Sequence, residues 1–180
     1  YAKASQYDWL RTLPHTLVPP VPSLFTFQLP LSGLRALMGV SVSMVRLKLE
    51  GSHWMERGPL LLTHWGLSGP AVLKLSAWAA RELHDKGYDF IVRINWLDEG
   101  EQELRTRWQG IRDKMGNQKL YSRNPFLLPQ RLWIYLLEEE AIPEAQTWSN
   151  LPAKMQNRLI HQLTNYAAHV QGKTTFKEEF

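Results

Sequence analysis

The sequence has 180 residues, of which 44% are hydrophobic and 21% charged, with 11 Gly, 11 Pro and no Cys. These proportions are ordinary for a globular chain and exclude a collagen, a disulfide-stapled small domain and a bulk-disordered tail. The net charge of +4 is only a weak indication of nucleic-acid binding, and the absence of Cys removes thiol nucleophiles and thiolate metal sites and fits a reducing, cytoplasmic compartment.

The chain shows no sign of a membrane span or a secretory leader. No apolar run approaches the roughly 20 residues that a membrane-spanning helix needs. The start, Tyr1 to Ser5, lacks both an initiator Met and a signal-peptide pattern, and the end, Phe176 to Phe180, stops inside a predicted strand. We therefore expect a chain that does not cross a bilayer, and we interpret it as a piece of a longer protein.

Extended segments dominate the first hundred residues. The Pro-rich stretch 18–22 excludes a helix, because Pro fixes its own φ and restricts the residue before it. Gly58-Pro59 predicts a bulge within a strand. Alternation of apolar and polar side chains predicts strands at 24–29, 45–49, 53–63 and 88–97, a hairpin turn at 50–52 and a last strand at 174–180.

Four segments have the apolar spacing of amphipathic helices. They are 70–86, 101–115, 129–140 and a segment that begins near 152 and continues to about 170. Pro70 suits the first turn of the first helix. The last helix is expected to take Ser149 or Asn150 as its N-cap and to carry Tyr166 on its apolar stripe.

The order of these elements predicts an α+β fold. Several short antiparallel strands with Gly and Pro interruptions favour a small closed or partly open β-barrel, and three consecutive helices form a separate block. We therefore expect a β-barrel subdomain over 1–100 plus 172–180, which includes the helix 70–86, and an inserted helical subdomain over 101–171.

The most unusual segment is the strand, turn and helix start that runs from Leu60 to Pro70. The backbone N–H groups of Gly69, Ala71 and Val72, with the Ser68 hydroxyl, could hold a phosphate, carboxylate or carbonyl oxygen, because the first-turn donors of a helix have no intrahelical partner. The simpler and more common alternative is that Ser68 is an N-cap and the glycines only make the turn.

Known catalytic and metal motifs do not fit. The stretch from Gly66 to Pro70 lacks the second Gly of a nucleophile elbow, and it has no acid to orient His64 as a base. The six His residues have no metal-ligand spacing, and no Gly-x-Gly-x-x-Gly fingerprint occurs. We predict no catalytic residue and no metal site in this chain.

Eight Trp residues and a basic balance are compatible with nucleic-acid binding by stacking. Against this, Trp78, Trp96 and Trp108 lie on or next to apolar stripes, where core packing is the default, and the basic residues of 101–115 alternate with acidic ones. A stand-alone nucleic-acid-binding barrel is therefore kept as the less favoured alternative.

The segment Leu62-Thr-His-Trp-Gly-Leu-Ser-Gly-Pro-Ala-Val-Leu73 is similar to the signature of the aminoacetone-oxidase-like FAD-binding flavoproteins, a group that also includes bile-acid-reductase-like enzymes. The segments 15–24, 128–132 and 172–176 resemble further stretches of the family in the same order. One departure is Pro14, where the family usually has Gly, and a larger one is the absence of both FAD-domain segments.

The resemblance implies the insert of an FAD-dependent oxidoreductase, placed between two halves of a dinucleotide-binding domain, with a translation-factor-like β-barrel and a small helical subdomain. FAD then belongs to the full-length parent, with none bound by this fragment, and the partner is the FAD-binding domain of the same chain. The candidates for the cleft over flavin and substrate are Thr63, His64, Gly66, Ser68, Gly69 and Pro70. A purely structural or oligomerisation role for the insert is the other alternative.

Overall fold

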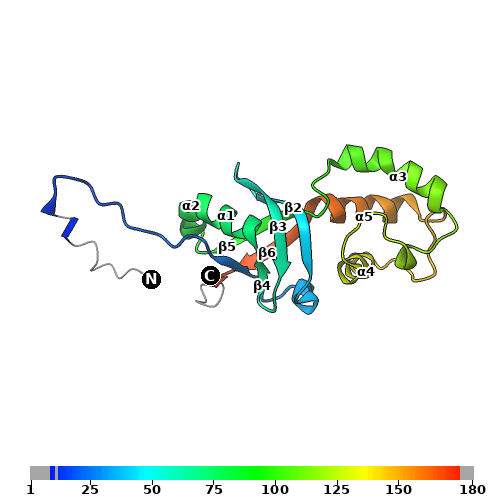
Figure 1. Ribbon diagram of the computed structural model, residues 1–180, viewed down its shortest axis with the longest axis horizontal. Helices are drawn as coiled ribbons and strands as arrows, with labels where there is room; N and C mark the ends of the chain where they lie inside the picture. The colour runs from blue at the N-terminus through cyan, green and yellow to red at the C-terminus, as the bar shows by residue number, and fades with distance from the viewer. Residues whose placement is uncertain (1–8, 11, 175–180) are drawn as a thin grey trace.

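The computed structural model describes residues 9–10 and 12–174, which form an α+β fold as predicted (Figure 1). The strands are β1 (Thr26–Gln28), β2 (Ser41–Leu49), β3 (Met55–Leu62), β4 (Gly66–Ser68), β5 (Asp89–Asn95), β6 (Tyr166–Gln171) and β7 (Lys173–Thr174). The helices are α1 (Pro70–Trp78), α2 (Ala80–Asp85), α3 (Glu101–Met115), α4 (Gln130–Glu139) and α5 (Ala153–Asn165), with short 3₁₀ helices η2 (Gly33–Leu37) and η3 (Leu120–Ser122).

The strands form one antiparallel sheet in the order β6-β5-β2-β3-β4-β1-β7. Its two edge strands, β6 and β7, are joined in sequence by the single residue Gly172. The Gly172 N–H donates to the Tyr88 carbonyl at 2.8 Å, and the Gly172 carbonyl accepts from the Gln28 N–H at 3.1 Å. The sheet therefore curls until its edges approach, which confirms the predicted barrel in its partly open form.

The predicted half-buried strand at 45–49 is confirmed within β2. Val45, Leu47 and Leu49 are fully buried, because alternate side chains of a strand point to the same face. The pairing is irregular at Gly58-Pro59 as predicted, but the bulge is not in that strand: Val42 pairs with Leu60 and Val45 pairs with Gly58, so the extra residue belongs to β2.

The helix predicted over 70–86 is in fact two helices that meet at Ala79. Ala79 has a ψ of 9°, far from the helical value near −42°, so the chain bends there. Hydrogen bonds of helical spacing still cross the bend, from the Ala79 N–H to the Leu75 carbonyl and from the Leu83 N–H to the Ala79 carbonyl. Apolar periodicity continues through such a bend, so it could not show the break.

The predicted end of the last helix is wrong. The helix α5 stops at Asn165, and the following residues form β6, which pairs with β5 from Ile94↔Tyr166 to Asp89↔Gln171. Tyr166 and Val170 are four residues apart, a spacing that fits a helix and a strand equally well. The exposed residue His169 beside buried Val170 shows the alternation of a strand.

The N-cap prediction for α5 is wrong as well. Pro152 occupies that position and no side chain caps the helix. Ser149 instead donates its hydroxyl hydrogen to the Gly116 carbonyl at 2.9 Å, and its N–H donates to the same carbonyl at 3.0 Å. This residue therefore satisfies a carbonyl at the end of α3 instead of starting α5.

An aromatic core holds the helical region, which lies to one side of the sheet in Figure 1. Trp108, Trp133 and Trp148 are fully buried, and the rings of Trp133 and Trp148 are nearly parallel, with centroids 6.0 Å apart. The expected core packing is confirmed for Trp96 and Trp108 but is wrong for Trp78, which is 64% exposed on α1.

The remaining predictions concern the chain ends. Residues 18–22 have no regular secondary structure, and Thr174 lies in β7 as expected, while 175–180 of the predicted last strand fall outside the described residues. None of the helices in the described part of the chain is long and apolar enough to span a membrane.

Candidate functional site

A tight turn links β3 to β4, and Thr63 closes it. The Thr63 N–H donates to the Gly66 carbonyl at 2.8 Å, and the Thr63 hydroxyl both donates to that carbonyl at 3.2 Å and accepts from the Gly66 N–H at 3.1 Å. The Thr63 side chain is buried. Thr63 therefore positions the turn through bonds inside the chain.

Both glycines of the segment are required by the packing of the chain on itself. A Cβ at Gly66 would lie 2.2 Å from the Phe27 carbonyl oxygen, and one at Gly69 would lie 2.9 Å from the Pro59 carbonyl oxygen. The φ values of Gly66 and Gly69 are 154° and 101°, which residues with a side chain rarely adopt. The space that these glycines leave open is thus filled by the neighbouring strands.

Ser68 does not cap α1, contrary to the simpler of the two alternatives. The N-cap is Gly69, no side chain makes a capping hydrogen bond, and the Gly69 carbonyl accepts the first helical bond from the Leu73 N–H at 3.0 Å. Ser68 lies in β4 opposite Leu61 and is buried. Pro70 is the first residue of α1, where its missing N–H costs nothing.

His64 is the exposed side chain at the tip of the turn. Its ring packs against Trp65 with centroids 4.1 Å apart. Its carbonyl accepts a 2.7 Å hydrogen bond from Nε of Arg35, and the same guanidinium donates to the Pro30 carbonyl at 2.9 Å. The arginine of η2 therefore fixes the backbone of the turn while the imidazole faces solvent.

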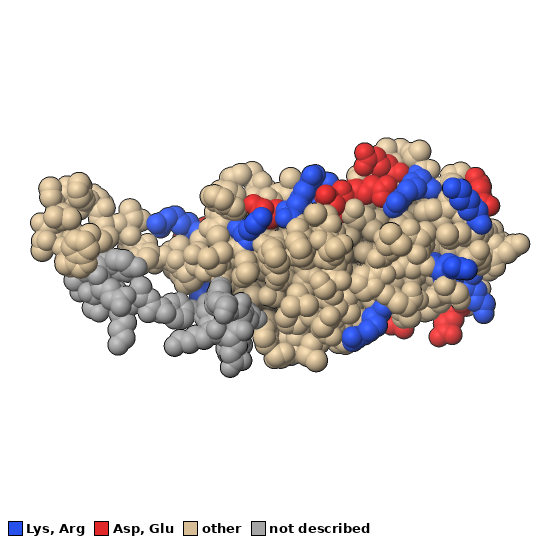
Figure 2. Space-filling view, in the orientation of Figure 1, with Lys and Arg blue, Asp and Glu red and all other residues tan. Residues whose placement is uncertain are grey.

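Exposed apolar side chains flank η2 and occur on β3. Leu31 is 89% exposed, Met38 55% and Leu61 37%. The Gly39 N–H donates to the Leu62 carbonyl at 2.8 Å, which places Met38 near the turn, where the exposed Arg35 also lies. In Figure 2 the surface over the β4 end of the sheet shows no charged side chain. A cluster of exposed apolar side chains of this kind often marks a contact surface.

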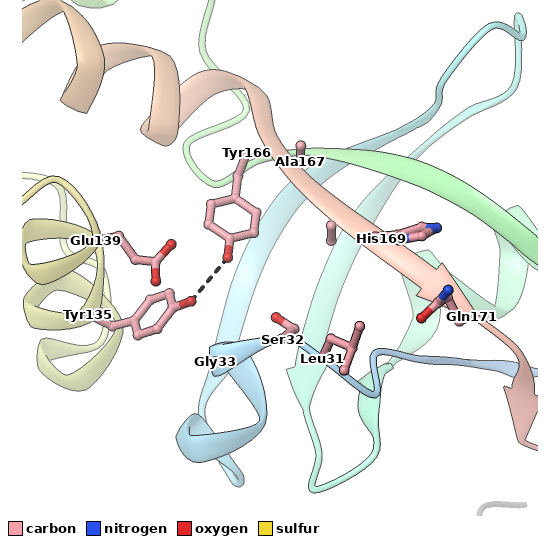
Figure 3. A pocket seen from close by; sticks show the side chains of 10 residues that line it. Leu31, Ser32, Gly33, Tyr135, Glu139, Tyr166, Ala167, His169 and Gln171 are labelled. Carbon is pink, nitrogen blue, oxygen red and sulfur yellow. Dashed lines mark hydrogen bonds between the residues drawn. The ribbon is translucent and has the colours of Figure 1, made fainter.

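A polar pocket lies on the other side of η2, where η2, α4 and β6 meet (Figure 3). It has a volume of about 260 Å³. Tyr135 of α4 and Tyr166 of β6 point toward each other across it, with their hydroxyl oxygens 3.2 Å apart. Ser32 and Glu139 also line it. The helical region and the sheet therefore contact each other in this pocket through a pair of phenol side chains.

Burial controls the protonation of these two phenols. It raises the pKa of the Tyr135 hydroxyl well above its ordinary range, and the hydrogen bond with Tyr166 acts in the same direction. Burial also raises the pKa of the Tyr166 hydroxyl. Both side chains are therefore neutral hydrogen-bonding groups at physiological pH.

A family model described as HI0933-like protein barrel and H2TH domain matches residues 21–180. The chain belongs to this HI0933-like family. Domains of this family occur in FAD-dependent oxidoreductase-like proteins. The barrel in the family description agrees with the curled sheet of the structure.

A curated relative of this HI0933-like domain comes from Escherichia coli (strain K12) and is named ribosomal RNA dihydrouridine synthase. The two sequences are 34% identical over 179 residues. The match covers 98% of this chain and 40% of the relative, so the chain spans about two fifths of the length of that protein.

Within the HI0933-like domain, the six predicted site residues all lie in the segment 63–70. They differ in how far they are exposed to solvent. His64 and Pro70 are exposed, whereas Thr63, Gly66 and Ser68 are buried. Gly69 is intermediate. The side chain with most freedom to meet a ligand is therefore His64.

Sequence analysis missed the residues that come to the site from a distance. Arg35 contacts the turn from η2, and Tyr135 and Tyr166 meet from elements 31 residues apart in sequence. No spacing motif links such residues. Within residues 9–10 and 12–174, no group of three or more His, Asp or Glu side chains gathers to hold a metal ion.

Proposed function

We propose that this chain is the insert domain of an FAD-dependent oxidoreductase that forms dihydrouridine in ribosomal RNA. The observation that carries this proposal is the 34% identity, over 98% of the chain, to a ribosomal RNA dihydrouridine synthase. Dihydrouridine is uridine with one carbon–carbon double bond of the base reduced, and a flavin is a reductant suited to that change. The narrower likeness to aminoacetone-oxidase-like and bile-acid-reductase-like flavoproteins stays a prediction.

The pairing of β1 with β7 supports the placement of this chain as an insert. Thr26 lies opposite Thr174, and Phe27 lies opposite Lys173. The segments that lead into and out of the domain therefore run side by side. A domain inserted into a loop of another domain needs this geometry, because both of its connections must return to one place.

The surface around the β3–β4 turn supports a contact with the FAD-binding domain of the same parent chain. Leu31, Met38 and Leu61 expose apolar surface on η2's flanks and on β3, and His64 is exposed at the tip of the turn. In this proposal the FAD-binding domain covers the apolar side chains, and His64 contacts the polar edge of the substrate base in the cleft between the domains.

The flavin's phosphates belong to the other domain in this proposal, because the glycine turn of this chain does not fit them. A dinucleotide site uses glycines so that a pyrophosphate can approach the backbone. Here the space beside Gly66 and Gly69 is taken by the carbonyl oxygens of Phe27 and Pro59. The contribution of this chain is therefore a wall of the cleft, which positions the substrate and excludes water.

The sequence offers a matched pair of variants for the experiment. His64-Trp65 at one end of β3 and His53-Trp54 at the other have the same composition, with ring centroids 4.1 and 4.3 Å apart and both His side chains exposed. His64→Ala and His53→Ala would be made in the full-length protein. The measurement is dihydrouridine in ribosomal RNA by mass spectrometry, with flavin absorbance as a separate readout.

We expect the purified full-length protein to be yellow and His64→Ala to slow dihydrouridine formation by about tenfold or more, the effect of losing one polar contact in a buried site. His53→Ala should keep normal activity. A full-length protein without flavin absorbance would overturn the proposal. Equal activity of the two variants would show that His64 does not contact the substrate, and it would favour a purely structural role for the insert.

A further inference from the structure

One face of the β3-β2-β5 part of the sheet carries a grid of basic side chains. Residues directly opposite each other in antiparallel strands project to the same face. The strand register therefore places six side chains in two rows across the three strands. The first row is Arg57, Arg46 and Asn95, and the second row is Met55, Lys48 and Arg93.

Two like-charge pairs stand directly across strands in this grid. Arg57 lies opposite Arg46, and Arg93 lies opposite Lys48. Like charges at opposed positions destabilise a sheet, so packing alone gives no reason for them. Residues that lower local stability are expected where a surface has a function. The grid is therefore a candidate for recognition of an anionic partner.

Carboxylates neutralise only part of this charge. Asp98 accepts from Arg46 at 2.7 Å and lies 3.1 Å from Arg57, and Glu50 pairs with Arg93. Among the described residues no carboxylate pairs with Lys48, which is exposed in the middle of the grid. Counting the grid and its ion-pair partners, four cations against two carboxylates leave two positive charges in excess; Asp89, farther along β5 on the same face, pairs with His169.

The helical region has a different charge pattern. Over α3, basic and acidic side chains alternate in Figure 2. Arg105 pairs with Glu101 at 2.7 Å and Arg107 pairs with Glu99 at 2.7 Å. This alternation is typical of a solvated helix face, so the excess positive charge of the sheet face is a local feature.

A hollow of about 270 Å³ opens between the grid and the end of α5. Arg46, Lys48 and Arg93 line it, with the polar side chains of Asn95 and Asn165 at its sides. Guanidinium and ammonium groups match the oxygens of a phosphate group. The described residues that line it include no aromatic ring on which a base could stack.

We propose that this basic face binds the phosphate backbone of RNA. The inference rests on the proposed function, which makes RNA the substrate, and it adds where the RNA lies. Phosphate contacts position a nucleic acid without reading its sequence, which fits a face of cations and amides. Six residue steps along the chain lead from Arg57 in β3 to Thr63, about 20 Å of extended chain, so a strand of RNA that crosses the face reaches the β3–β4 turn.

Two single substitutions with opposite expected effects test this proposal. Lys48→Gln removes the unpaired cation, and Asp98→Asn removes the carboxylate that neutralises Arg46 and Arg57. Lys114→Gln on α3 is the matched control, because Lys114 is also exposed and has no ion pair among the described residues. The full-length protein that contains this chain is titrated against a fluorescently labelled single-stranded RNA of mixed sequence at several salt concentrations.

We expect Lys48→Gln to weaken binding and to lower the slope of log affinity against log salt by about 0.7, the value for one lost phosphate contact with a single strand. Asp98→Asn should tighten binding, and Lys114→Gln should leave it unchanged. Circular dichroism confirms that each variant is folded. A fold defect would weaken binding in both variants, so opposite signs are specific to charge.

Equal affinity and equal salt slope for wild type, Lys48→Gln and Lys114→Gln would overturn the inference. Displacement of the RNA from this face by an acidic polypeptide at equal charge concentration would also overturn the inference. That result would assign the face to a protein partner. Both outcomes are measured without flavin or reductase turnover. They are therefore distinguishable from failure of the proposed function, in which dihydrouridine formation itself is absent.

Discussion

The carbonyl oxygen of His64 accepts a 2.7 Å hydrogen bond from Nε of Arg35, across 29 residues of sequence. The bond ties the tip of the β3–β4 turn to η2, which also lines the polar pocket through Ser32 and Gly33. A single exposed arginine therefore connects the two features that make this end of the sheet a candidate site.

Arg35→Ala should loosen the turn. It removes the bonds to the His64 and Pro30 carbonyls, and we expect the free energy of unfolding to fall by about 1–2 kcal/mol. Amide hydrogen exchange at Thr63 and Gly66 should become faster. Arg81→Ala is the control, because Arg81 has one long 3.5 Å bond to the Pro19 carbonyl and should cost under about 0.5 kcal/mol. Unchanged exchange at the turn would show that η2 does not hold it.

Three Gly→Ala variants should separate close packing from backbone conformation. Gly66→Ala brings a Cβ within 2.2 Å of the Phe27 carbonyl oxygen, so we expect a loss of more than about 4 kcal/mol or failure to fold. At Gly51 nothing lies within 4 Å and φ is 73°, so only backbone strain of about 1–2 kcal/mol remains. Gly110→Ala in α3 should stabilise by up to about 1 kcal/mol. Urea denaturation measures all three, and a mild Gly66→Ala would contradict the packing argument.

The phenols of the pocket should make the protein sensitive to alkali. Burial raises the pKa of Tyr135 and Tyr166 in the fold above the unfolded value of about 10. The resulting stability is complete below pH about 10, and it is lost as the pH rises further, because the unfolded state then releases protons that the fold retains. An ultraviolet titration should find that Tyr135 and Tyr166 ionise late, together with Tyr121, whose pKa burial also raises. The late phase should shrink in the Tyr135→Phe, Tyr166→Phe double variant and disappear in denaturant.

Two buried tryptophans of the helical core should respond differently to the same change. Trp133 donates its indole N–H to the Leu120 carbonyl at 2.8 Å, whereas the indole nitrogen of Trp148 has no hydrogen-bond partner among the described residues. Trp133→Phe should therefore cost about 1 kcal/mol more than Trp148→Phe, since it removes a buried hydrogen bond and leaves the Leu120 carbonyl with only the long 3.4 Å bond from the Arg123 N–H. Urea midpoints at an unchanged m-value measure the difference. Equal costs would show that only ring volume matters there.

Local patterns in the sequence were enough for most elements. The α3 boundaries, Glu101 to Met115, were predicted as they occur, and the alternation of Val45, Leu47 and Leu49 identified β2. The same reasoning failed at Tyr166 and Val170, because a spacing of four suits both periods and only the pairing with β5 decides between them. It also missed β4, whose three residues are too few to show any period.

The candidate site divides in the same way. The segment from Thr63 to Pro70 was found from sequence, because its chemistry is contiguous. The sequence could not show that Ser68 is not a cap. Nor could it show that Phe27 and Pro59 occupy the space beside the neighbouring glycines, because both features depend on how the strands pack. The basic face is likewise invisible in sequence, since Arg57, Arg46 and Arg93 meet only through strand register.

The sequence by itself determined the fold class, the order of most elements and the segment around the β3–β4 turn, because these depend on residues within one or two turns of each other. Only the tertiary structure decided the approach of the two sheet edges at Gly172, the phenol pair of the pocket and the grid of cations. Those features join residues far apart in the chain, and contacts of that kind are set by how all elements bury their apolar faces together.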